Sequence, residues 1–270
     1  MTRPEWAPED VDISVPNAAR MYDYSLGGFH NFAVDREMVE RVVSLAPNAR
    51  QIGLANRAFL GRVVRRLVAG GVRQFLDVGS GIPTLANVHE VAQQADPRAR
   101  VMYVDIDPVA VAHGRAILAG NPNADAMLGD VRRPDDIVRH PEVSGLLDFT
   151  EPVAVLLIAV LHFVPDADDP AGIVRRFREA VKPGSYIAIS HGSPPPQREQ
   201  DAAAVTSVYQ RTSTPLHLRS TEEIRGLLDG LDIVEPGVVP VTDWHPEPED
   251  AGTEPRPEVL AAVGRKPSGR

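Results

Sequence analysis

The fold is decided by the stretch Phe75-Leu76-Asp77-Val78-Gly79-Ser80-Gly81. A short apolar run ends at Asp77, and a glycine-rich turn follows it. The residues after the turn, from Ile82 to Ala95, predict a helix. A strand, a tight turn and a helix in this order bring backbone N–H groups up to a small ligand. We therefore expect a ligand-binding site at this loop, formed by Asp77, Gly79, Ser80 and Gly81.

Asp77 indicates the charge of that ligand. The residue stands two positions before Gly79, where a carboxylate would repel the pyrophosphate of NAD. A ligand with a cationic end would be attracted instead. S-adenosyl-L-methionine carries a sulfonium and an ammonium group, so the loop favours this cofactor over NAD.

Composition excludes several classes of protein. The chain has 270 residues, of which 43% are hydrophobic and 24% charged, as is ordinary for a globular protein with one substantial core. Its net charge of −9 argues against a general nucleic-acid binder, which needs clustered Lys and Arg. The sequence contains no cysteine, which excludes disulfides and zinc–thiolate sites. The histidines show no metal-ligand spacing, so we predict no metal.

Nothing in the sequence predicts a membrane segment. The N-terminus lacks the apolar core of a signal peptide. The longest apolar run, Pro152–Val164, is interrupted by His162 and is too short to span a bilayer. We therefore expect a cytoplasmic protein that contacts neither membrane nor nucleic acid.

Strand and helix patterns alternate along the chain from residue 73 onward. Unbroken apolar runs predict strands at 73–78, 100–106, 124–128, 152–159 and 185–190. Helical periodicity marks 56–69, 108–119, 171–181, 199–210 and 221–229. Two final strands, 232–239 and 259–264, have no helix between them, which predicts an antiparallel pair. The fold class is therefore α/β: a Rossmann-like, doubly wound, mostly parallel seven-stranded sheet with an antiparallel terminal strand pair and an N-terminal helical cap.

Asp105 is the second candidate ligand residue. In such sheets ligands bind at the carboxyl ends of the strands, and Asp105 ends the strand 100–106. A carboxylate at roughly 20 residues from the glycine turn can accept hydrogen bonds from both ribose hydroxyls. The alternative is a helix cap or a solvated loop carboxylate, although Asp107 is the better placed N-cap because Pro108 follows it. Asp130, after the strand 124–128, is either a ligand residue or a turn residue.

The region 73–190 resembles a class I (Rossmann-like) S-adenosylmethionine-dependent methyltransferase. The segments that carry this resemblance are Asp77–Gly81, Tyr103–Asp107, Leu128–Val131 and Val181–Gly184. Two further segments, Asn17–Gly28 and Ala55–Leu60, resemble a bacterial S-adenosyl methyltransferase family first catalogued as a domain of unknown function. The resemblance implies that Asp130 accepts a hydrogen bond from the adenine amino group, that Val131 donates its backbone N–H to the ring, and that Ile106 packs on the adenine face.

The resemblance also implies a division of the chain into segments. We expect a flexible N-terminus at 1–16, a helical cap or lid at 17–70, an S-adenosylmethionine-dependent methyltransferase domain at 71–266 and a flexible tail at 267–270. Within the cap, Tyr22 and Asn31 are predicted to lie near the methyl donor, with Gly27 and Gly28 as a hinge. The alternative is that the aromatic residues of this segment form a satellite core against the sheet.

The acceptor side leaves a weaker signature. Methyl transfer from a sulfonium is an in-line displacement that depends mainly on positioning and desolvation. If the acceptor is a hydroxyl, His162 and His191 are candidate general bases, because each follows a predicted strand. The alternative is a structural role for either histidine. We predict a methyltransferase that acts on an unidentified small molecule; a cofactor-binding module without turnover and an NAD(P)-dependent oxidoreductase remain as alternatives.

Overall fold

One eight-stranded sheet organises the molecule, in the order β3-β2-β1-β4-β5-β8-β6 with β7 also paired to β8. The structure is a computed structural model, and it describes residues 4, 6–9, 11–83, 86–194, 199–210, 212–247 and 258–268. The strands are β1 (Gln74–Val78), β2 (Arg100–Asp105), β3 (Ala124–Leu128), β4 (Ala154–Ile158), β5 (Tyr186–Gly192), β6 (Asp232–Ile233), β7 (Val239–Pro240) and β8 (Val259–Arg265).

The first five strands are parallel, and β8 runs antiparallel to them. Leu76 of β1 pairs with Met102 of β2 and with Val155 of β4. Every residue of β1 and β4 is buried, which explains why β4 is entirely apolar; β1 also contains the buried polar residues Gln74 and Asp77. The predicted Rossmann-like fold is confirmed. The predicted strand 232–239 is two short strands instead, because a turn containing Gly237 at φ +96° interrupts it, and both pieces pair with β8.

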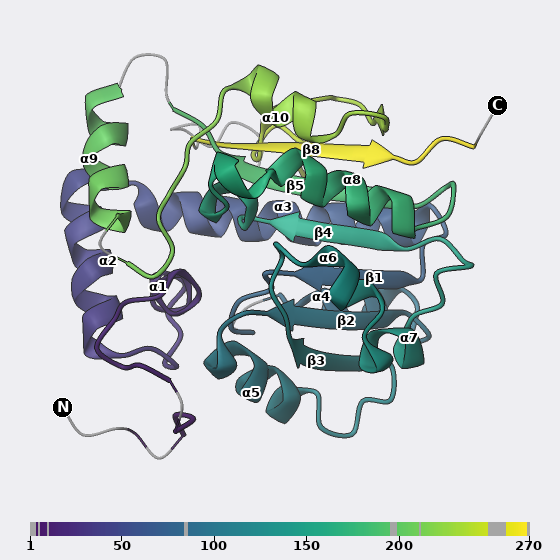
Figure 1. Cartoon of the computed structure of the whole chain (residues 1–270), viewed down its shortest axis with the longest axis horizontal. Coiled ribbons are helices and arrows are strands. Elements are labelled where there is room, and N and C mark those ends of the chain that lie inside the picture. The colour runs from purple at the N-terminus through teal and green to yellow at the C-terminus, as the bar shows by residue number, and fades with distance from the viewer. Residues whose placement is uncertain are drawn as a thin grey trace.

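Helices cover both faces of this sheet (Figure 1). Two buried apolar clusters hold them there, one on each face. One face carries α3 (Ala49–Ala69) and α4 (Val88–Ala95). The opposite face carries α6 (Pro134–Val138), α7 (Pro141–Leu146), α8 (Pro170–Ala180) and α10 (Thr221–Leu227), while α5 (Pro108–Ile117) packs beside β3.

The α3 helix is the longest in the described chain. Its predicted part was 56–69, where Leu60, Val64 and Leu67 recur at helical spacing and are buried against the sheet. The helix begins earlier, at Ala49, and Gly70 follows its last turn. This additional N-terminal part extends past the sheet and brings α3 residues to the ligand side of the molecule.

The α4 helix begins later than predicted. The sequence analysis placed a helix at Ile82–Ala95, directly after the glycine turn, but α4 starts at Val88. Asn87 and Glu90 form a capping box that fixes this start. The chain from Gly79 to Pro83 is therefore an extended loop, and residues 84–85 lie outside the described residues.

Three helices lie beyond the carboxyl ends of the parallel strands, at the left of Figure 1. They are α1 (Ala18–Ser25), α2 (Ala33–Leu45) and α9 (Glu199–Tyr209). A small apolar cluster of Met21, Val39, Val42 and Val208 joins them, separate from the two clusters at the sheet. We call these three helices the cap. Its third member, α9, comes from late in the chain and was not predicted to belong to it.

The described part of the N-terminal segment 1–16 is packed, so the expectation of a loose segment was wrong there. Trp6 stacks on Phe32, with ring centroids 5.2 Å apart. Ala7 and Val11 are buried in the same cluster as Phe32. Residues 1–3, 5 and 10, together with 269–270 of the predicted tail, lie outside the described residues.

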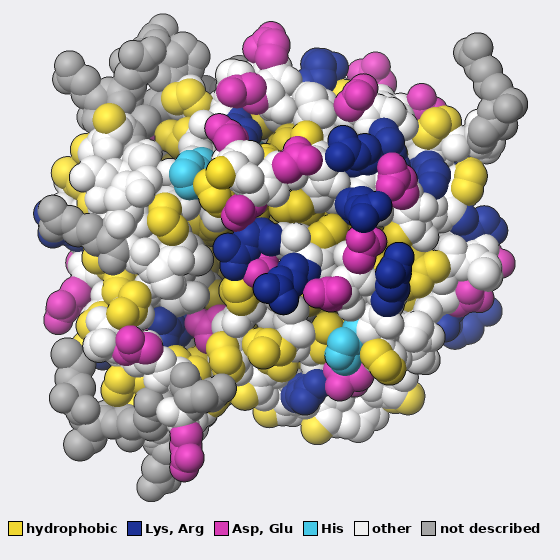
Figure 2. Space-filling view, viewed as in Figure 1, with side chains coloured by type: hydrophobic (Ala, Val, Ile, Leu, Met, Phe, Trp, Pro, Cys, Tyr) yellow, Lys and Arg dark blue, Asp and Glu magenta, His cyan; other side chains and the backbone are white. Residues whose placement is uncertain are grey.

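The face of the molecule shown in Figure 2 has mixed charge. Lys and Arg side chains alternate there with Asp and Glu side chains rather than gathering into one basic area. Exposed ion pairs such as Arg176–Asp135 at 2.9 Å and Arg115–Glu142 at 2.9 Å contribute to the mixture. Within the described ranges, no helix has both the length and the apolar character that crossing a membrane requires.

Candidate functional site

A cavity of about 470 Å³ lies at the carboxyl ends of the parallel strands, where the cap faces the sheet. Its walls come from the loops after β1, β2 and β3, from the N-terminal part of α3, and from the cap helices. The segments 158–165 and 213–218 add to the lining, together with residues 192–193 and 258–259. The predicted loops of the sheet therefore meet at one place, as the topology requires.

The glycine loop enters this cavity because two of its residues adopt left-handed backbone conformations. Gly79 has φ +72° and Gly81 has φ +67°, a region that favours glycine. A Cβ at Gly79 would overlap the side chain of Val160, so the loop packs directly on the segment after β4. A Cβ at Gly81 would meet no atom within 4 Å, which leaves open space beside the loop. Ser80 lines the cavity with both glycines.

Asp105 lies beside the glycine loop and is buried. Its carboxylate accepts hydrogen bonds from the Gly81 N–H at 2.7 Å and from the Asp107 N–H at 2.8 Å. Burial raises the pKa of Asp105 to about 6, and the two backbone N–H groups oppose this shift. Asp107, as predicted, is the N-cap of α5 and accepts from the Val109 N–H. Asp105 therefore has no capping duty, and it lines the cavity.

Asp77 is the most deeply placed acid of the cavity. Burial raises its pKa to about 7, with Arg57 opposing the shift and Asp105 adding to it. Arg57 comes from α3 and is itself buried. Its Nε has no hydrogen-bond partner among the described residues. The cavity therefore holds an acid with an unusually high proton affinity next to an incompletely satisfied guanidinium.

Arg57 and its neighbour Asn56 were not singled out as site residues by the sequence analysis. The sequence feature that could have indicated them is two consecutive polar residues, Asn and Arg, among the apolar residues that α3 buries. Asn56 joins three elements: its Nδ2 donates to Tyr22 Oη at 3.1 Å, and its Oδ1 accepts from Ser190 Oγ at 2.6 Å. Tyr22 also donates to the Gly53 carbonyl at 2.9 Å and lines the cavity.

Asn31, which was predicted to lie near the donor, is not part of the cavity lining. Its Nδ2 donates to Asp23 Oδ2 at 2.8 Å and to the Gly28 carbonyl at 3.0 Å. Its Oδ1 accepts from Arg36 at 3.0 Å. These bonds close the turn between α1 and α2. A Cβ at Gly28 would overlap the Asp23 carboxylate, so this glycine is explained by close packing in that turn.

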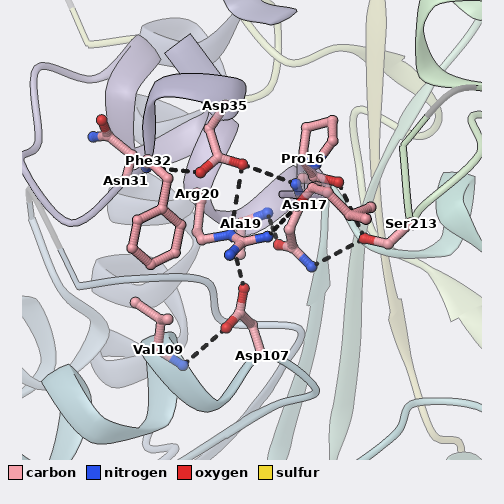
Figure 3. Close-up of polar contacts among 12 residues, drawn as sticks. Pro16, Asn17, Ala19, Arg20, Asn31, Phe32, Asp35, Asp107, Val109 and Ser213 are labelled. Atoms are coloured by element: carbon pink, nitrogen blue, oxygen red, sulfur yellow. Dashed lines mark hydrogen bonds and ion pairs between the residues drawn. The ribbon is translucent and has the colours of Figure 1, made fainter. Parts of the chain in front are cut away.

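A buried ion cluster fastens the cap to the sheet domain (Figure 3). Arg20 Nε of α1 lies 3.5 Å from Asp35 Oδ1 of α2 and 3.4 Å from Asp107 Oδ2 at the start of α5. The Arg20 guanidinium also lies over the Phe32 ring, 4.9 Å from its centroid. Burial raises the pKa of Asp35 and of Asp107, and Arg20 opposes both shifts. We call these three residues the cap latch.

The loops after β2 and β3 supply the rest of the predicted site. Ile106, Asp130 and Val131 all line the cavity. Ile106 is 49% exposed, which is unusual for a large apolar side chain and leaves its surface available for a ligand. The Asp130 carboxylate accepts from the Arg132 backbone N–H at 2.9 Å, from its Nε at 2.9 and 3.0 Å, and from its Nη2 at 2.6 Å. Arg132 is a lining residue that the sequence analysis missed.

His162 lines the cavity, but its hydrogen bonds do not suit a general base. Its Nδ1 accepts from the Gly192 N–H at 3.1 Å, which places the proton of the neutral ring on Nε2. Burial holds the pKa of His162 well below its usual value, and nearby His191 and Arg219 add to this effect. Nε2 has no hydrogen-bond partner among the described residues, so His162 presents an N–H donor.

His191, the second candidate base, does not line the cavity. Its side chain is fully buried. One ring nitrogen, Nε2, accepts from Arg219 at 2.9 Å, and Nδ1 donates to the Gly192 carbonyl at 2.7 Å. Arg219 is in turn paired with Asp166 at 2.6 Å. His191 therefore has the structural role that was its alternative.

Comparisons with known proteins agree with this geometry. The model of a family described as S-adenosyl methyltransferase matches residues 4–267. The solved structure of a DUF574 family protein from Streptomyces avermitilis MA-4680 has a TM-score of 0.91 and 38% identity, covering 95% of this chain and 99% of that chain. A candidate methyltransferase from Thermobifida fusca YX has the same TM-score of 0.91 and 38% identity, covering 98% and 100%. A search of curated proteins found no match.

More distant structures share the fold alone. An O-methyltransferase family protein from Burkholderia thailandensis has a TM-score of 0.53 and 16% identity over 84% of this chain and 63% of that chain. Fold and cavity together define a class I, Rossmann-like S-adenosylmethionine-dependent methyltransferase. Within that class, the chain belongs to the S-adenosyl methyltransferase family.

Proposed function

We propose that the chain is an enzyme that binds S-adenosyl-L-methionine in the described cavity and transfers its methyl group to a small molecule. The observation that carries this proposal is the pair of buried acids, Asp77 and Asp105, on either side of a glycine loop with open space beside it. Buried carboxylates with raised pKa values need a partner, and a cationic ligand that also carries hydroxyl groups supplies both kinds of partner.

The residues present fit the donor part by part. Asp77 faces the cationic end, and the unpartnered Arg57 Nε is suited to an anionic group such as a carboxylate. Asp105 is placed to accept hydrogen bonds from the ribose hydroxyls in addition to the backbone N–H groups that it already binds. Exposed Ile106 packs on the adenine face, Asp130 accepts from the adenine amino group, and Val131 donates its N–H to the ring.

The chain's own contribution to the reaction is positioning. When bound, the donor supplies an electrophilic methyl group. The glycine loop and Asp105 fix the donor on the sheet, while Tyr22 and the cap helices close the opposite side and exclude water. Holding two reactants in line can account for several kcal/mol of a barrier, on the order of 7–11 for well-oriented cases.

Calorimetry tests the donor assignment. We expect dissociation constants below about 1 mM for S-adenosylmethionine and S-adenosylhomocysteine and no measurable binding of NAD. Binding of NAD alone would support an oxidoreductase instead. Incubation with methyl-labelled donor and a mixture of small molecules then tests turnover, because donor binding without any transfer would identify a binding module.

A further inference from the structure

The cavity has two halves with different walls. On the cap side, Val39 and Val42 of α2 and Val205 and Tyr209 of α9 line it. Phe163, from the short helix η1 (Leu161–Phe163), faces the same space, and its ring centroid lies 5.9 Å from that of Tyr209. We call these five residues the acceptor chamber. Its surface consists of aliphatic side chains and two aromatic rings.

Charged groups are concentrated in the other half. Five ionisable lining residues come from α3 and from β1 and the loops after β1, β2 and β3: Arg57, Asp77, Asp105, Asp130 and Arg132. Outside that group, the ionisable residues of the described lining are His162, His217 and Glu258 and the two tyrosines Tyr22 and Tyr209. Glu258 lies at the start of β8, where its carbonyl accepts from the Ser193 N–H. The acceptor chamber itself contains no Lys, Arg, Asp or Glu, so a charged molecule would lose its hydration there without compensation.

Two polar groups break the apolar surface. His162 is 8% exposed, its ring centroid lies 4.4 Å from that of Phe163, and its Nε2 presents an unpartnered N–H. The Tyr209 hydroxyl also has no hydrogen-bond partner among the described residues, and burial raises the pKa of Tyr209 to about 12. Both groups therefore remain neutral donors near pH 7. A neutral donor on an apolar wall fixes the orientation of one oxygen atom on an otherwise apolar molecule.

We propose, on the basis of the function stated above, that the methyl acceptor is an uncharged aromatic molecule that carries a phenol-like hydroxyl. Its ring packs between Phe163, Tyr209 and the valines of the acceptor chamber, in contacts that aromatic pairs favour. Its hydroxyl oxygen accepts a hydrogen bond from His162 Nε2. This oxygen is the atom that is methylated.

The acidity of the hydroxyl follows from the state of His162. Because Nδ1 is occupied by the Gly192 N–H, the ring cannot accept a proton from the acceptor without breaking that bond. An aliphatic alcohol needs such a base, whereas a phenol, with a pKa near 10 as in tyrosine, ionises far more readily. The hydroxyl proton passes to water. An electron pair of the oxygen forms the new O–C bond as the methyl–sulfur bond breaks, and the pair of that bond remains on sulfur as a neutral thioether.

A matched panel of acceptors tests the proposal. The probes are 1-naphthol and phenol, with cyclohexanol as the aliphatic match and 4-hydroxybenzoate and tyramine as charged matches. Transfer of labelled methyl is measured for each, and donor affinity is measured separately by calorimetry. We expect transfer to the neutral phenols at rates at least tenfold above those of the other three. Donor binding with transfer to none of the neutral phenols, or with equal transfer to cyclohexanol, overturns the acceptor proposal alone; absence of donor binding overturns the proposed function as well.

Two variants of α9 locate the acceptor. Val205→Glu introduces a charge into the acceptor chamber, whereas Ala203→Glu introduces the same charge at an exposed position of the same helix. We expect Val205→Glu to lower kcat/KM for the phenol at least tenfold with an unchanged donor dissociation constant. Ala203→Glu should behave as the wild type. Equal activity of the two variants would place the acceptor elsewhere.

The pH profile distinguishes a donor from a base at His162. At saturating methyl donor, we expect the rate to rise with pH in a limb that moves to lower pH when a more acidic, nitro-substituted phenol is used. His162→Asn retains an N–H donor and should keep this limb, while His162→Phe should lower the rate at least tenfold. A limb that stays fixed for both phenols and disappears in His162→Asn would assign a base role to His162 and overturn the proposal.

Discussion

Asp77 links the chemistry of one buried carboxyl group to the pH at which the protein works. Its pKa is raised to about 7, mainly by burial, so the ligand-free site holds a proton for part of the neutral range. A cationic ligand requires the ionised carboxylate, and its binding therefore releases that proton. In the proposed function, the protonation of Asp77 therefore sets the pH below which the donor binds more weakly.

Donor affinity should consequently fall as the pH falls below about 7. Below this pKa the carboxyl group is protonated and neutral, and a cation gains nothing from it. We expect the dissociation constant to increase by about 25-fold between pH 7.5 and pH 5.5 from the titration of Asp77 alone. Calorimetry across this range measures the effect. In Asp77→Asn the donor affinity should begin to fall only near pH 6, where Asp105 titrates. A pH profile of affinity identical to that of the wild type would exclude Asp77 as the titrating group.

Asp105→Asn should weaken donor binding about tenfold or more without unfolding the protein. The substitution removes one acceptor oxygen from a buried site, which costs about 1–3 kcal/mol when a ligand hydroxyl loses its partner. Asp125→Asn, at an exposed position of β3, is the matched control and should bind as the wild type does. Equal dissociation constants for the two variants would show that Asp105 has only a local structural role.

The glycine loop and the acids at the strand ends could be predicted because each is a local signal. Asp77 and Asp105 end apolar runs, and the sheet topology alone brings such ends together. Arg57 and Arg20 could not be assigned in this way. Their partners are distant in the sequence and are brought to them by the packing of α3 and of the cap. His191 could not be distinguished from His162 in the sequence, because both follow predicted strands, whereas in the structure His191 lies within β5 and His162 lies in η1.

The helix α1 is held to its neighbours by the side chain of Arg20. Arg20 connects α1 to α2 through Asp35 and to α5 through Asp107. The Asp107 N–H donates to Asp105, so one hydrogen bond connects the cap latch to the proposed ribose site.

Arg20→Met should destabilise the protein by about 3–5 kcal/mol, because it leaves two buried carboxylates facing each other without a cation. Chemical denaturation measures the change. Arg50→Met, which breaks the exposed Arg50–Glu40 pair, should cost less than about 1 kcal/mol. The stability that Arg20→Met loses should be smaller at lower pH, because Asp35 and Asp107 can then take up protons. A loss that does not depend on pH would mean that packing of the Arg20 stem over Phe32 dominates.

The sheet as a whole was predictable, whereas the cap was predictable only in part. Alternating strands and helices at 73–190 define the parallel sheet, and the terminal antiparallel strands follow from the missing helix before 259–264. The boundary of α4 was misplaced because the capping box of Asn87 and Glu90 was not recognised. The predicted cap lacked α9, because this helix joins the cap through tertiary contacts of Val205, Val208 and Tyr209 that leave no local pattern in the sequence.

Hydrogen exchange should report closure of the cap over the donor. With S-adenosylhomocysteine bound, we expect slower exchange in α1, in α2 and in the loop 79–83, because these segments line or support the cavity. Exchange in α8 and α10, which pack on the sheet away from the cavity, should not change. Protection confined to the loop would show that the cap does not respond to the donor.

The separation of the cap cluster from the sheet clusters has a consequence for how this family can diversify. Val39, Val42 and Val208 pack with Met21 apart from the side chains that hold the sheet together. Substitutions in the cap cluster leave the packing of the two sheet clusters intact, so fewer of them should lower the stability below the level that function requires. A combinatorial library restricted to Val39, Val42, Val205 and Tyr209 would therefore sample new substrates while the donor loops remain unchanged. In the proposed function, the residues that bind the donor therefore lie in different segments of the chain from the residues that contact the acceptor.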